Sequence, residues 1–323
     1  MSEPMVSVIV PVKDRREMLG RLLDGLREQK YRDFEVIVID DGSSDGSFDE
    51  AAKAASDDFR VRVLRTEGVG AVEARRRGVE VSRAPYLAFT DSDCVPDPTW
   101  LDNAMAAFTD GVDLVQGRTE PVRPLGLLER SVWITYEDGL YQTCNVLYRR
   151  EAFDRAGGFE DAYGLLGFRP GAFGQGLGFG EDALLAWRVK RTGQAAFVPD
   201  AVVRHEVTRP PDDEALRRSW MAGAFPTLIR EIPELRGTML RGGVFLGTRR
   251  IPLYAAVVSF LLGRRGLAAA ALAWWVGARA RDAMRHEQPL PKRAEAVALE
   301  LASDAITGAA LVAGSVRARK LVL

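Results

Sequence analysis

Short apolar runs alternate with amphipathic patterns over residues 5–93. The apolar, often β-branched runs predict buried strands at Met5–Val12, Phe34–Asp40, Val61–Glu67 and Pro85–Thr90. Apolar residues three or four positions apart predict helices between them, at Arg16–Gln29, Ser47–Ser56 and Ala71–Ser82. This alternation indicates a parallel sheet with helices on its faces. Right-handed crossovers would bring the carboxyl ends of the strands, and with them Asp41 and Asp93, to one edge.

Residues 224–323 have a different pattern, which is apolar and alanine-rich with basic interruptions. The run Ile251–Gly263 is apolar, Arg264–Arg265 interrupts it, and an apolar helix with a basic end is expected over Leu267–Arg285. We therefore divide the chain into an α/β domain at residues 1–223 and an α-helical region at residues 224–323.

Two interpretations of this C-terminal region stay open. In one, its helices form a bundle packed on the core. In the other, residues 251–285 lie along a membrane surface, because Trp274 and Trp275 beside arginine clusters suit the boundary between water and lipid. No stretch reaches the roughly 18 uninterrupted apolar residues of a spanning helix. We expect a cytoplasmic protein, at most peripheral on the inner face of the cell membrane.

Composition narrows the class of protein. The chain has 323 residues, of which 47% are hydrophobic and 28% charged, as in ordinary globular proteins. A formal net charge of -1 argues against nucleic acid as a partner, because that function usually needs a basic surface. Cys94 and Cys144 are the only cysteines, so we expect a reducing compartment and a structural role for both. The N-terminus lacks the basic segment of a signal peptide.

Two carboxylates, Asp91 and Asp93, follow the fourth predicted strand with only Ser92 between them. Like charges this close repel each other, and each loses hydration at the end of a buried strand. A divalent cation would compensate both, because hard cations prefer carboxylate oxygens. The alternative is a polar turn that caps the strand, in which aspartate and serine are ordinary residues.

A second acidic pair, Asp40 and Asp41, ends the second predicted strand. The loop after it is neither a Walker A loop nor a G-x-G-x-x-G motif, which disfavours a dinucleotide fold of the NAD type. Its carboxylates could accept hydrogen bonds from a nucleobase N–H or ribose hydroxyls. Arg75 suits phosphate or base recognition, whereas we interpret Arg76 and Arg77 as a solvated helix face. With the D-S-D segment, these parts fit a nucleoside diphosphate held by a metal.

Two further groups could carry chemistry in the second half of the chain. Glu181 and Asp182 begin a predicted helix after a glycine-rich stretch. Acids in a first turn are favoured by capping and by the helix dipole, so one interpretation is structural. The other is general base catalysis on an acceptor hydroxyl. His205 follows a strand-like run, and a lone histidine is usually a polar side chain with a satisfied partner.

Four segments occur in the order of a known family: VSVIVPVKDR, FEVIVIDDGSSDGS, GAVEARRRGVEVSRAPYLAFTDSD and GFGEDALLAWRVKRTG. Together they resemble the family 2 glycosyltransferases of the GT-A fold, over residues 5 to about 208. The resemblance implies a Rossmann-like, mostly parallel α/β sheet flanked by helices, with a C-terminal helical extension. It also implies transfer from a nucleotide-diphosphate sugar, with a divalent metal, Mn²⁺ or Mg²⁺, as the cofactor.

The resemblance also implies roles for individual residues, with the D-S-D segment as the family's D-x-D motif. The residues expected to bind the nucleotide sugar are Pro11, Asp14, Asp41, Arg75, Asp91, Ser92 and Asp93. The residues expected to hold the metal are Asp91, Asp93 and His205. Asp182 is the expected general base for inverting transfer, and Glu181 would orient it or the acceptor. Asn145 is expected on the acceptor side.

Two departures from the family affect these expectations. Cys94 follows the D-x-D where an acidic or amide residue is common, which indicates an altered metal shell. No Q-x-x-R-W occurs after the E-D pair; the chain has LRRSWMAGA at Leu216–Ala224 instead. That absence favours a non-processive enzyme that adds one or a few sugars to a glycan or a lipid-linked acceptor of the cell envelope.

Two other functions stay open. A sugar-phosphate nucleotidyltransferase is also an α/β protein with metal-binding carboxylates, but the segment PVKDRREML lacks the glycines of its signature. A protein that binds a nucleotide sugar without turnover would need no general base. The presence of Asp91, Asp93 and Asp182 together argues against it.

Overall fold

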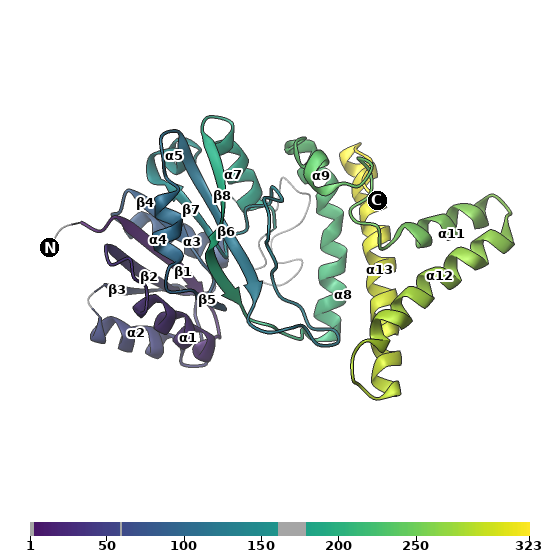
Figure 1. Ribbon diagram of the computed structural model, residues 1–323, viewed down its shortest axis with the longest axis horizontal. Helices are drawn as coiled ribbons and strands as arrows, with labels where there is room; N and C mark the ends of the chain where they lie inside the picture. The colour runs from purple at the N-terminus through teal and green to yellow at the C-terminus, as the bar shows by residue number, and fades with distance from the viewer. Residues whose placement is uncertain (1–2, 59, 161–178) are drawn as a thin grey trace. The chain divides into compact units, whose positions relative to one another are not determined.

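The computed structural model describes residues 3–58, 60–160 and 179–323. The described chain forms two compact units, drawn in Figure 1. The first contains residues 3–124, 131–160 and 179–207, and the second contains residues 125–130 and 208–323. The last boundary between the two units along the sequence lies between Val207 and Thr208. The predicted domain division after residue 223 stays a prediction. Gly178, the first residue of the segment GFGEDALLAWRVKRTG, lies outside the described residues.

The first unit is built on one mixed sheet, which has eight strands among the described residues in the order β3-β2-β1-β4-β7-β6-β8-β5. The strands are β1 Val6–Val12, β2 Phe34–Asp40, β3 Val61–Arg65, β4 Tyr86–Phe89, β5 Cys94–Pro96, β6 Val112–Pro121, β7 Val146–Arg149 and β8 Gln194–His205. Strands β3, β2, β1 and β4 are parallel. Strand β7 runs antiparallel to β4 and β6, and β5 runs antiparallel to β8.

Helices cover this sheet (Figure 1). Those of the first unit are α1 Arg16–Arg27, α2 Ser47–Asp57, α3 Ala71–Val81, α4 Trp100–Ala106, α5 Arg150–Arg155 and α7 Glu181–Lys190. Every residue of β1 and β2 is buried, which explains why these strands are continuous apolar runs rather than alternating ones. Elements β1 to β4 and α1 to α3 lie on the segments that the hydrophobic pattern predicts, so the α/β expectation is confirmed.

A close approach of α3 to the sheet sets the position of Arg75. A Cβ atom on Gly78 would lie 2.6 Å from Ile9 Cγ2 and 2.8 Å from Ile39 Cδ1. Only glycine fits there without a shift of the Ile9 and Ile39 side chains. Residues three apart share one face of a helix, so the same close face carries the buried Arg75 toward the end of the strands.

Replacement of Gly78 tests this packing. We expect Gly78→Ala to lower the free energy of unfolding by about 1–2 kcal/mol, because overpacking outweighs the better helix propensity of alanine. Gly20→Ala in α1 is the matched control, since the nearest atom to its added Cβ would be 4.0 Å away. That variant should gain up to about 1 kcal/mol. Urea unfolding measures both, and equal stabilisation of the two variants would contradict the packing argument.

The second unit is helical. Its elements are α8 Asp212–Met221, η1 Ala222–Ala224, α9 Phe225–Glu231, α10 Leu235–Met239, α11 Ile251–Leu261, α12 Arg265–Met284 and α13 Leu290–Ala318. Helix α13 packs on α8, η1, α9 and α12. A Cβ on Gly314 would lie 2.2 Å from the carbonyl oxygen of Gly223, so the backbones of α13 and η1 touch directly. Helix α13 is thus the centre of this unit.

Among the described residues, helix α13 is long and apolar enough to cross a membrane by length and composition. Charged residues such as Glu300 and Asp304 interrupt its sequence, so it agrees with the prediction that no stretch reaches roughly 18 uninterrupted apolar residues. The central helix of a helical bundle meets the same criterion, and α13 carries Asp304, which forms ion pairs with Arg249 and Arg279 inside the unit. Its apolar surface is therefore explained in part by packing.

Candidate functional site

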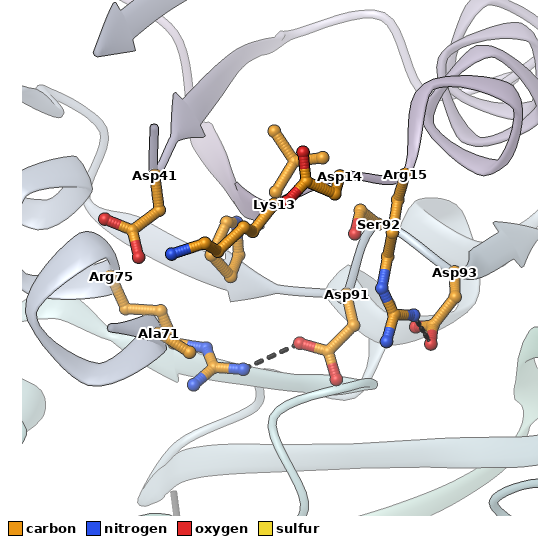
Figure 2. Close-up of a pocket in the computed structure, with 11 residues that line it drawn as sticks. Lys13, Asp14, Arg15, Asp41, Ala71, Arg75, Asp91, Ser92 and Asp93 are labelled. Atoms are coloured by element: carbon orange, nitrogen blue, oxygen red, sulfur yellow. Dashed lines mark hydrogen bonds and ion pairs between the residues drawn. The ribbon is translucent and has the colours of Figure 1, made fainter. Parts of the chain in front are cut away.

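A cavity of about 430 Å³ opens at the carboxyl ends of β1, β2 and β4 (Figure 2). Parallel strands of an open sheet bring their following loops together at this edge, where such sheets bind ligands. The cavity is lined by Pro11, Val12, Lys13, Asp14, Arg15, Asp41, Ala71, Arg75, Asp91, Ser92 and Asp93. It thus gathers every residue that we predicted to bind the nucleotide sugar.

Asp14 joins the loops that follow β1 and β2. Its backbone is left-handed, with a φ of 49°, a conformation that few residues other than glycine adopt. Its Oδ1 accepts hydrogen bonds from the backbone N–H of Ser44 at 2.7 Å and from the Ser44 hydroxyl at 3.1 Å. The Asp14 N–H donates to the Ser43 hydroxyl at 3.0 Å. These bonds hold one wall of the cavity in a defined shape.

Asp41 fixes the opposite wall, the loop before α3. Its Oδ1 accepts hydrogen bonds from the Thr66 hydroxyl and the Val69 N–H, both at 2.7 Å. Its Oδ2 accepts one from the Gly70 N–H at 2.9 Å. A carboxylate oxygen has two lone pairs, so Oδ2 can accept one more hydrogen bond. Asp41 is therefore a positioned acceptor for a ligand N–H or hydroxyl.

Arg75 lies at the base of the cavity and pairs with the first carboxylate of the D-x-D. Its Nη2 is 2.7 Å from Asp91 Oδ1, and its side chain is buried. Burial lowers the pKa of Arg75, but Asp91, Glu181 and Asp182 act in the opposite direction and raise that pKa above its ordinary value. Arg75 thus links the cavity electrostatically to the E-D pair of α7.

Arg15 pairs with the second carboxylate of the D-x-D. Its Nη1 forms an ion pair with Asp93 Oδ2, while much of the Arg15 side chain is exposed (Figure 2). A guanidinium therefore neutralises each of the two D-x-D carboxylates, which meets the expectation that these like charges need compensation. Because Arg15 is exposed, it can leave Asp93 for another partner at little cost.

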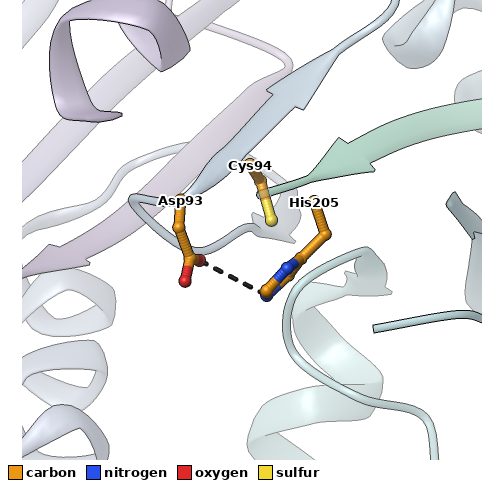
Figure 3. A group of neighbouring side chains, drawn as sticks. All are labelled: Asp93, Cys94 and His205. Carbon is orange, nitrogen blue, oxygen red and sulfur yellow. Dashed lines mark ion pairs between the residues drawn. The ribbon is translucent and has the colours of Figure 1, made fainter. Parts of the chain in front are cut away.

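The pairing of β5 with β8 brings His205 to Asp93. Cys94 and His205 are directly opposed in this antiparallel pair, and His205 Nε2 lies 3.6 Å from Asp93 Oδ1 (Figure 3). His205 Nδ1 is 2.8 Å from the carbonyl oxygen of Glu206, which can only accept, so Nδ1 carries a proton. The other ring nitrogen, Nε2, faces the carboxylate, so one cation could contact both groups.

Cys94 belongs to the same group, although we predicted a structural role for it. The ligand atoms of Asp93, Cys94 and His205 all lie within 4.8 Å of one another (Figure 3). Burial raises the pKa of the Cys94 thiol well above its usual value, so the sulfur is a thiol until a cation compensates it. The carboxylate, imidazole and sulfur atoms form a donor set that fits a divalent cation. Asp91, which we also predicted as a metal ligand, lies outside this group and pairs with Arg75.

Glu181 and Asp182 occupy the first turn of α7. Gly180 holds the N-cap position with a φ of 82°, and no side chain caps the helix in the part of the chain that the structure describes. Asp182 Oδ1 instead accepts a hydrogen bond from the Ala183 N–H at 2.8 Å, which satisfies one N–H of the first turn, so the structural interpretation of the pair stays open. Burial, and next the charge of Glu181, raise the pKa of Asp182 to about 8, against the opposing effects of the Ala183 N–H and of Arg75. Asp182 is a carboxylate whose proton affinity suits transfer near neutral pH.

The sequence is similar to those of known glycosyltransferases. The model of the family described as "Glycosyl transferase family 2" matches residues 7–159. This match confirms the predicted resemblance to family 2 glycosyltransferases over these residues. Glycosyltransferase AglE of Haloferax volcanii is 37% identical over 128 residues, which are 38% of this chain and 42% of AglE. The pre-mycofactocin glycosyltransferase of Mycobacterium tuberculosis is 27% identical over 292 residues, which are 80% of this chain and 57% of that protein. The chain spans about half the length of these curated relatives.

The fold agrees with a solved structure. The mannosyltransferase PcManGT from Pyrobaculum calidifontis, in complex with GDP-Man and Mn²⁺, superposes with a TM-score of 0.54 at 19% identity. The match covers 99% of this chain and 88% of that one. This confirms the predicted GT-A architecture of an α/β sheet flanked by helices.

One predicted site residue lies away from the cavity. Asn145 is fully buried, and all the polar atoms of its side chain are bonded inside the first unit. Its Oδ1 accepts a hydrogen bond from Trp100 Nε1 at 2.8 Å, and its Nδ2 donates to the carbonyl oxygens of Arg118 and Ala201. Asn145 therefore ties β6, β8 and α4 together, and its burial keeps its side chain from contact with an acceptor sugar.

Proposed function

We propose that the protein transfers a sugar from a nucleotide-diphosphate sugar to an acceptor hydroxyl, with inversion at the sugar carbon. The observation that carries this proposal is the single cavity that collects the predicted donor residues, with the Asp93 group and the E-D pair beside it. The family 2 match supports the same reaction class. It also disfavours the alternative of a sugar-phosphate nucleotidyltransferase.

Donor binding follows from the charges around the cavity. Asp41 accepts from the nucleobase or ribose, and the loop fixed by Asp14 forms the opposite wall of the cavity. The diphosphate lies toward Asp93, where Arg15 exchanges its carboxylate partner for a phosphate oxygen, a bidentate pairing that guanidinium groups favour. Asp93, His205 and Cys94 would hold a divalent metal, Mn²⁺ or Mg²⁺ by the family resemblance. When bound, such a metal stabilises the negative charge that develops on the departing diphosphate.

The general base of this proposal is Asp182. It takes the proton from the acceptor hydroxyl as oxygen attacks the sugar carbon from the side opposite the diphosphate, which inverts that carbon. Glu181 raises the proton affinity of Asp182, and Arg75 limits the rise. The two opposing charges keep the pKa of Asp182 near the working pH, where a general base is most effective.

Product analysis tests the reaction class. Purified protein is incubated with UDP-, GDP- and dTDP-sugars, with Mn²⁺ or Mg²⁺, and with or without a candidate acceptor. A glycosyltransferase releases nucleoside diphosphate, and the acceptor accelerates the release. Release of pyrophosphate from a nucleoside triphosphate would indicate a nucleotidyltransferase instead. Thermal stabilisation by a nucleotide sugar without any release would indicate a binding protein without turnover.

The finer assignments form part of the same proposal. The absence of Q-x-x-R-W supports addition of one or a few sugars rather than processive synthesis. The acceptor is a glycan or a lipid-linked molecule of the cell envelope, and the protein works at the cytoplasmic face of the membrane. Peripheral contact through the C-terminal helices would bring it to such an acceptor.

Cobalt substitution tests whether Cys94 is a ligand. If the Asp93 group holds the metal with Cys94, Co²⁺ should produce a near-ultraviolet absorption band of thiolate-to-cobalt charge transfer. Cys94→Ser should abolish that band and shift metal preference toward harder cations, because sulfur favours softer ions. Cys144→Ser is the matched control, since Cys144 is also buried but lies outside the group. An unchanged band in Cys94→Ser would remove the sulfur from the metal shell.

A further inference from the structure

The hairpin of α11 and α12 exposes many large apolar side chains. The two helices pack side by side and join at a turn around Gly263 (Figure 1). The exposed large apolar side chains along it, which we call the hairpin surface, are Val257, Val258, Phe260, Leu261, Leu262, Leu267, Leu272, Trp274 and Val276. Single exposed apolar residues are ordinary, but so many on two neighbouring helices indicate a docking site.

The opposite face of α12 shows that this exposure belongs to an ordered hairpin. Trp274 is 69% exposed, whereas its neighbour Trp275 is 7% exposed and donates from Nε1 to Asp304 Oδ2 on α13 at 3.2 Å. Arg279 is buried beside it, with Nε 3.7 Å from the same oxygen. Trp275 and Arg279 anchor the hairpin, so of the tryptophan pair only Trp274 can meet a partner. Our sequence prediction had placed both at the surface.

Charge identifies the partner. No acidic residue occurs between Ile251 and Arg281. Arg264 and Arg265 at the turn and Arg281 farther along α12 are exposed, and none forms a side-chain ion pair with a described residue. An apolar face rimmed by unpaired arginines complements a bilayer with anionic headgroups. A second copy of the chain would bring the same unpaired arginines against its own apolar surface, and interface cores exclude such charges.

Length determines how the hairpin can lie. Helix α11 has 11 residues and rises about 16 Å, and residues 265–278 of α12, before the buried Arg279, rise about 21 Å. Both are shorter than a hydrocarbon core of roughly 30 Å. Insertion of the turn first would carry Arg264 and Arg265 into the hydrocarbon, which is costly. A hairpin in the plane of the surface avoids this cost, because the arginine side chains reach the headgroups while Phe260 and Trp274 enter the acyl region.

We infer that the hairpin surface docks on an anionic phospholipid leaflet, with the helix axes of α11 and α12 in the membrane plane. This inference adds a lipid surface as a partner of the proposed glycosyltransferase, but it is argued only from the residues of the hairpin. Its test therefore needs no turnover.

Flotation of the full-length protein tests the inference. Vesicles of phosphatidylcholine alone are compared with vesicles that contain phosphatidylglycerol and phosphatidylcholine in a one-to-two mixture. We expect binding mainly to the anionic vesicles, with a loss at high salt. The double variant Arg264→Ser/Arg265→Ser should bind at least about tenfold more weakly, since each arginine near an anionic surface contributes about fivefold. Arg76→Ser/Arg77→Ser on α3 removes the same exposed charge elsewhere and should bind like wild type.

A second variant separates lipid contact from folding. Phe260→Ser/Leu261→Ser removes two side chains that are 66% and 76% exposed, so the fold should be unaffected, and its vesicle binding should fall by at least about tenfold. Calorimetric binding of UDP or GDP with Mn²⁺ should stay at the wild-type level in every hairpin variant. Wild-type protein that does not float at low salt would overturn the inference. A dimer in light scattering that dissociates in Phe260→Ser/Leu261→Ser would overturn it in favour of a second copy.

Discussion

Asp182→Asn is expected to lower sugar transfer by about 10²–10⁴-fold, the usual contribution of a general base, while donor binding stays unchanged. The amide can still accept the hydrogen bond from the Ala183 N–H, which lies 2.8 Å from Asp182 Oδ1, so the start of α7 should be kept. Single-turnover transfer and calorimetric donor binding measure the two effects separately. A variant with near-normal transfer would exclude Asp182 as the base.

The control for Asp182→Asn is another acid in a first helical turn. Asp49 in the first turn of α2 is exposed, so Asp49→Asn removes the favourable charge–dipole contact without touching the cavity. It should cost a few tenths of a kcal/mol of stability and leave transfer intact. If both variants lost the same amount of stability, and each lost transfer activity only in proportion to its loss of folded protein, the structural interpretation of the E-D pair would hold.

The raised pKa of Asp182 gives the same variant a second signature, in its stability. The folded protein favours the protonated carboxyl, so Asp182 contributes stability below the pKa of the unfolded state, near 4. That contribution disappears as the pH rises toward the folded value of about 8. Asp182→Asn has no such loss, so its stability relative to wild type should grow between pH 5 and pH 8. We expect a gain of about 1 kcal/mol or more, well below the full pKa shift because the side chain is partly exposed.

Much of the first unit could be predicted because its elements are encoded locally. Strands β1 and β2 are buried on both faces, so each is an apolar run, and the helices between them repeat at helical spacing. The parallel half of a sheet then fixes which loops meet. For that reason Asp14, Asp41, Arg75 and Asp93 were found from sequence and lie around one cavity.

The remaining site residues depended on pairings far apart in the chain. Cys94 belongs to the metal-ligand group because the pairing of β5 with β8 places Cys94 opposite His205. The sequence of β5 alone does not predict this register. Asn145 was assigned to the acceptor because it resembles a family segment, but its burial follows from the packing of Trp100 and Ala201 around it. A motif indicates which residues could bind a ligand or take part in catalysis, whereas strand pairing determines which of their side chains are accessible to a ligand.

The same limit applies in the second unit. The sequence showed that α12 is apolar with a tryptophan pair, but adjacent residues on a helix point about 100° apart. Which of Trp274 and Trp275 faces outward is set by Asp304, which lies on α13 and accepts a hydrogen bond from Trp275. A buried acceptor on a neighbouring helix therefore selects the anchoring residue and leaves the other at the surface.

Asp93→Asn is expected to weaken metal-dependent binding of a nucleoside diphosphate by at least about tenfold, because a charged oxygen ligand becomes neutral. Asp93 is the residue on which the whole arrangement converges, since it pairs with Arg15 and faces His205 Nε2 at 3.6 Å. Titration of UDP or GDP with and without Mn²⁺ isolates the metal-dependent part of the affinity. Asp97→Asn is the matched control, because Asp97 directly follows β5 but does not line the cavity. Its Oδ1 lies 2.9 Å from Arg204 Nε. If Asp93→Asn and Asp97→Asn bound the nucleotide equally well with Mn²⁺, the carboxylate of Asp93 would compensate Arg15 alone, and the metal would have to be held elsewhere.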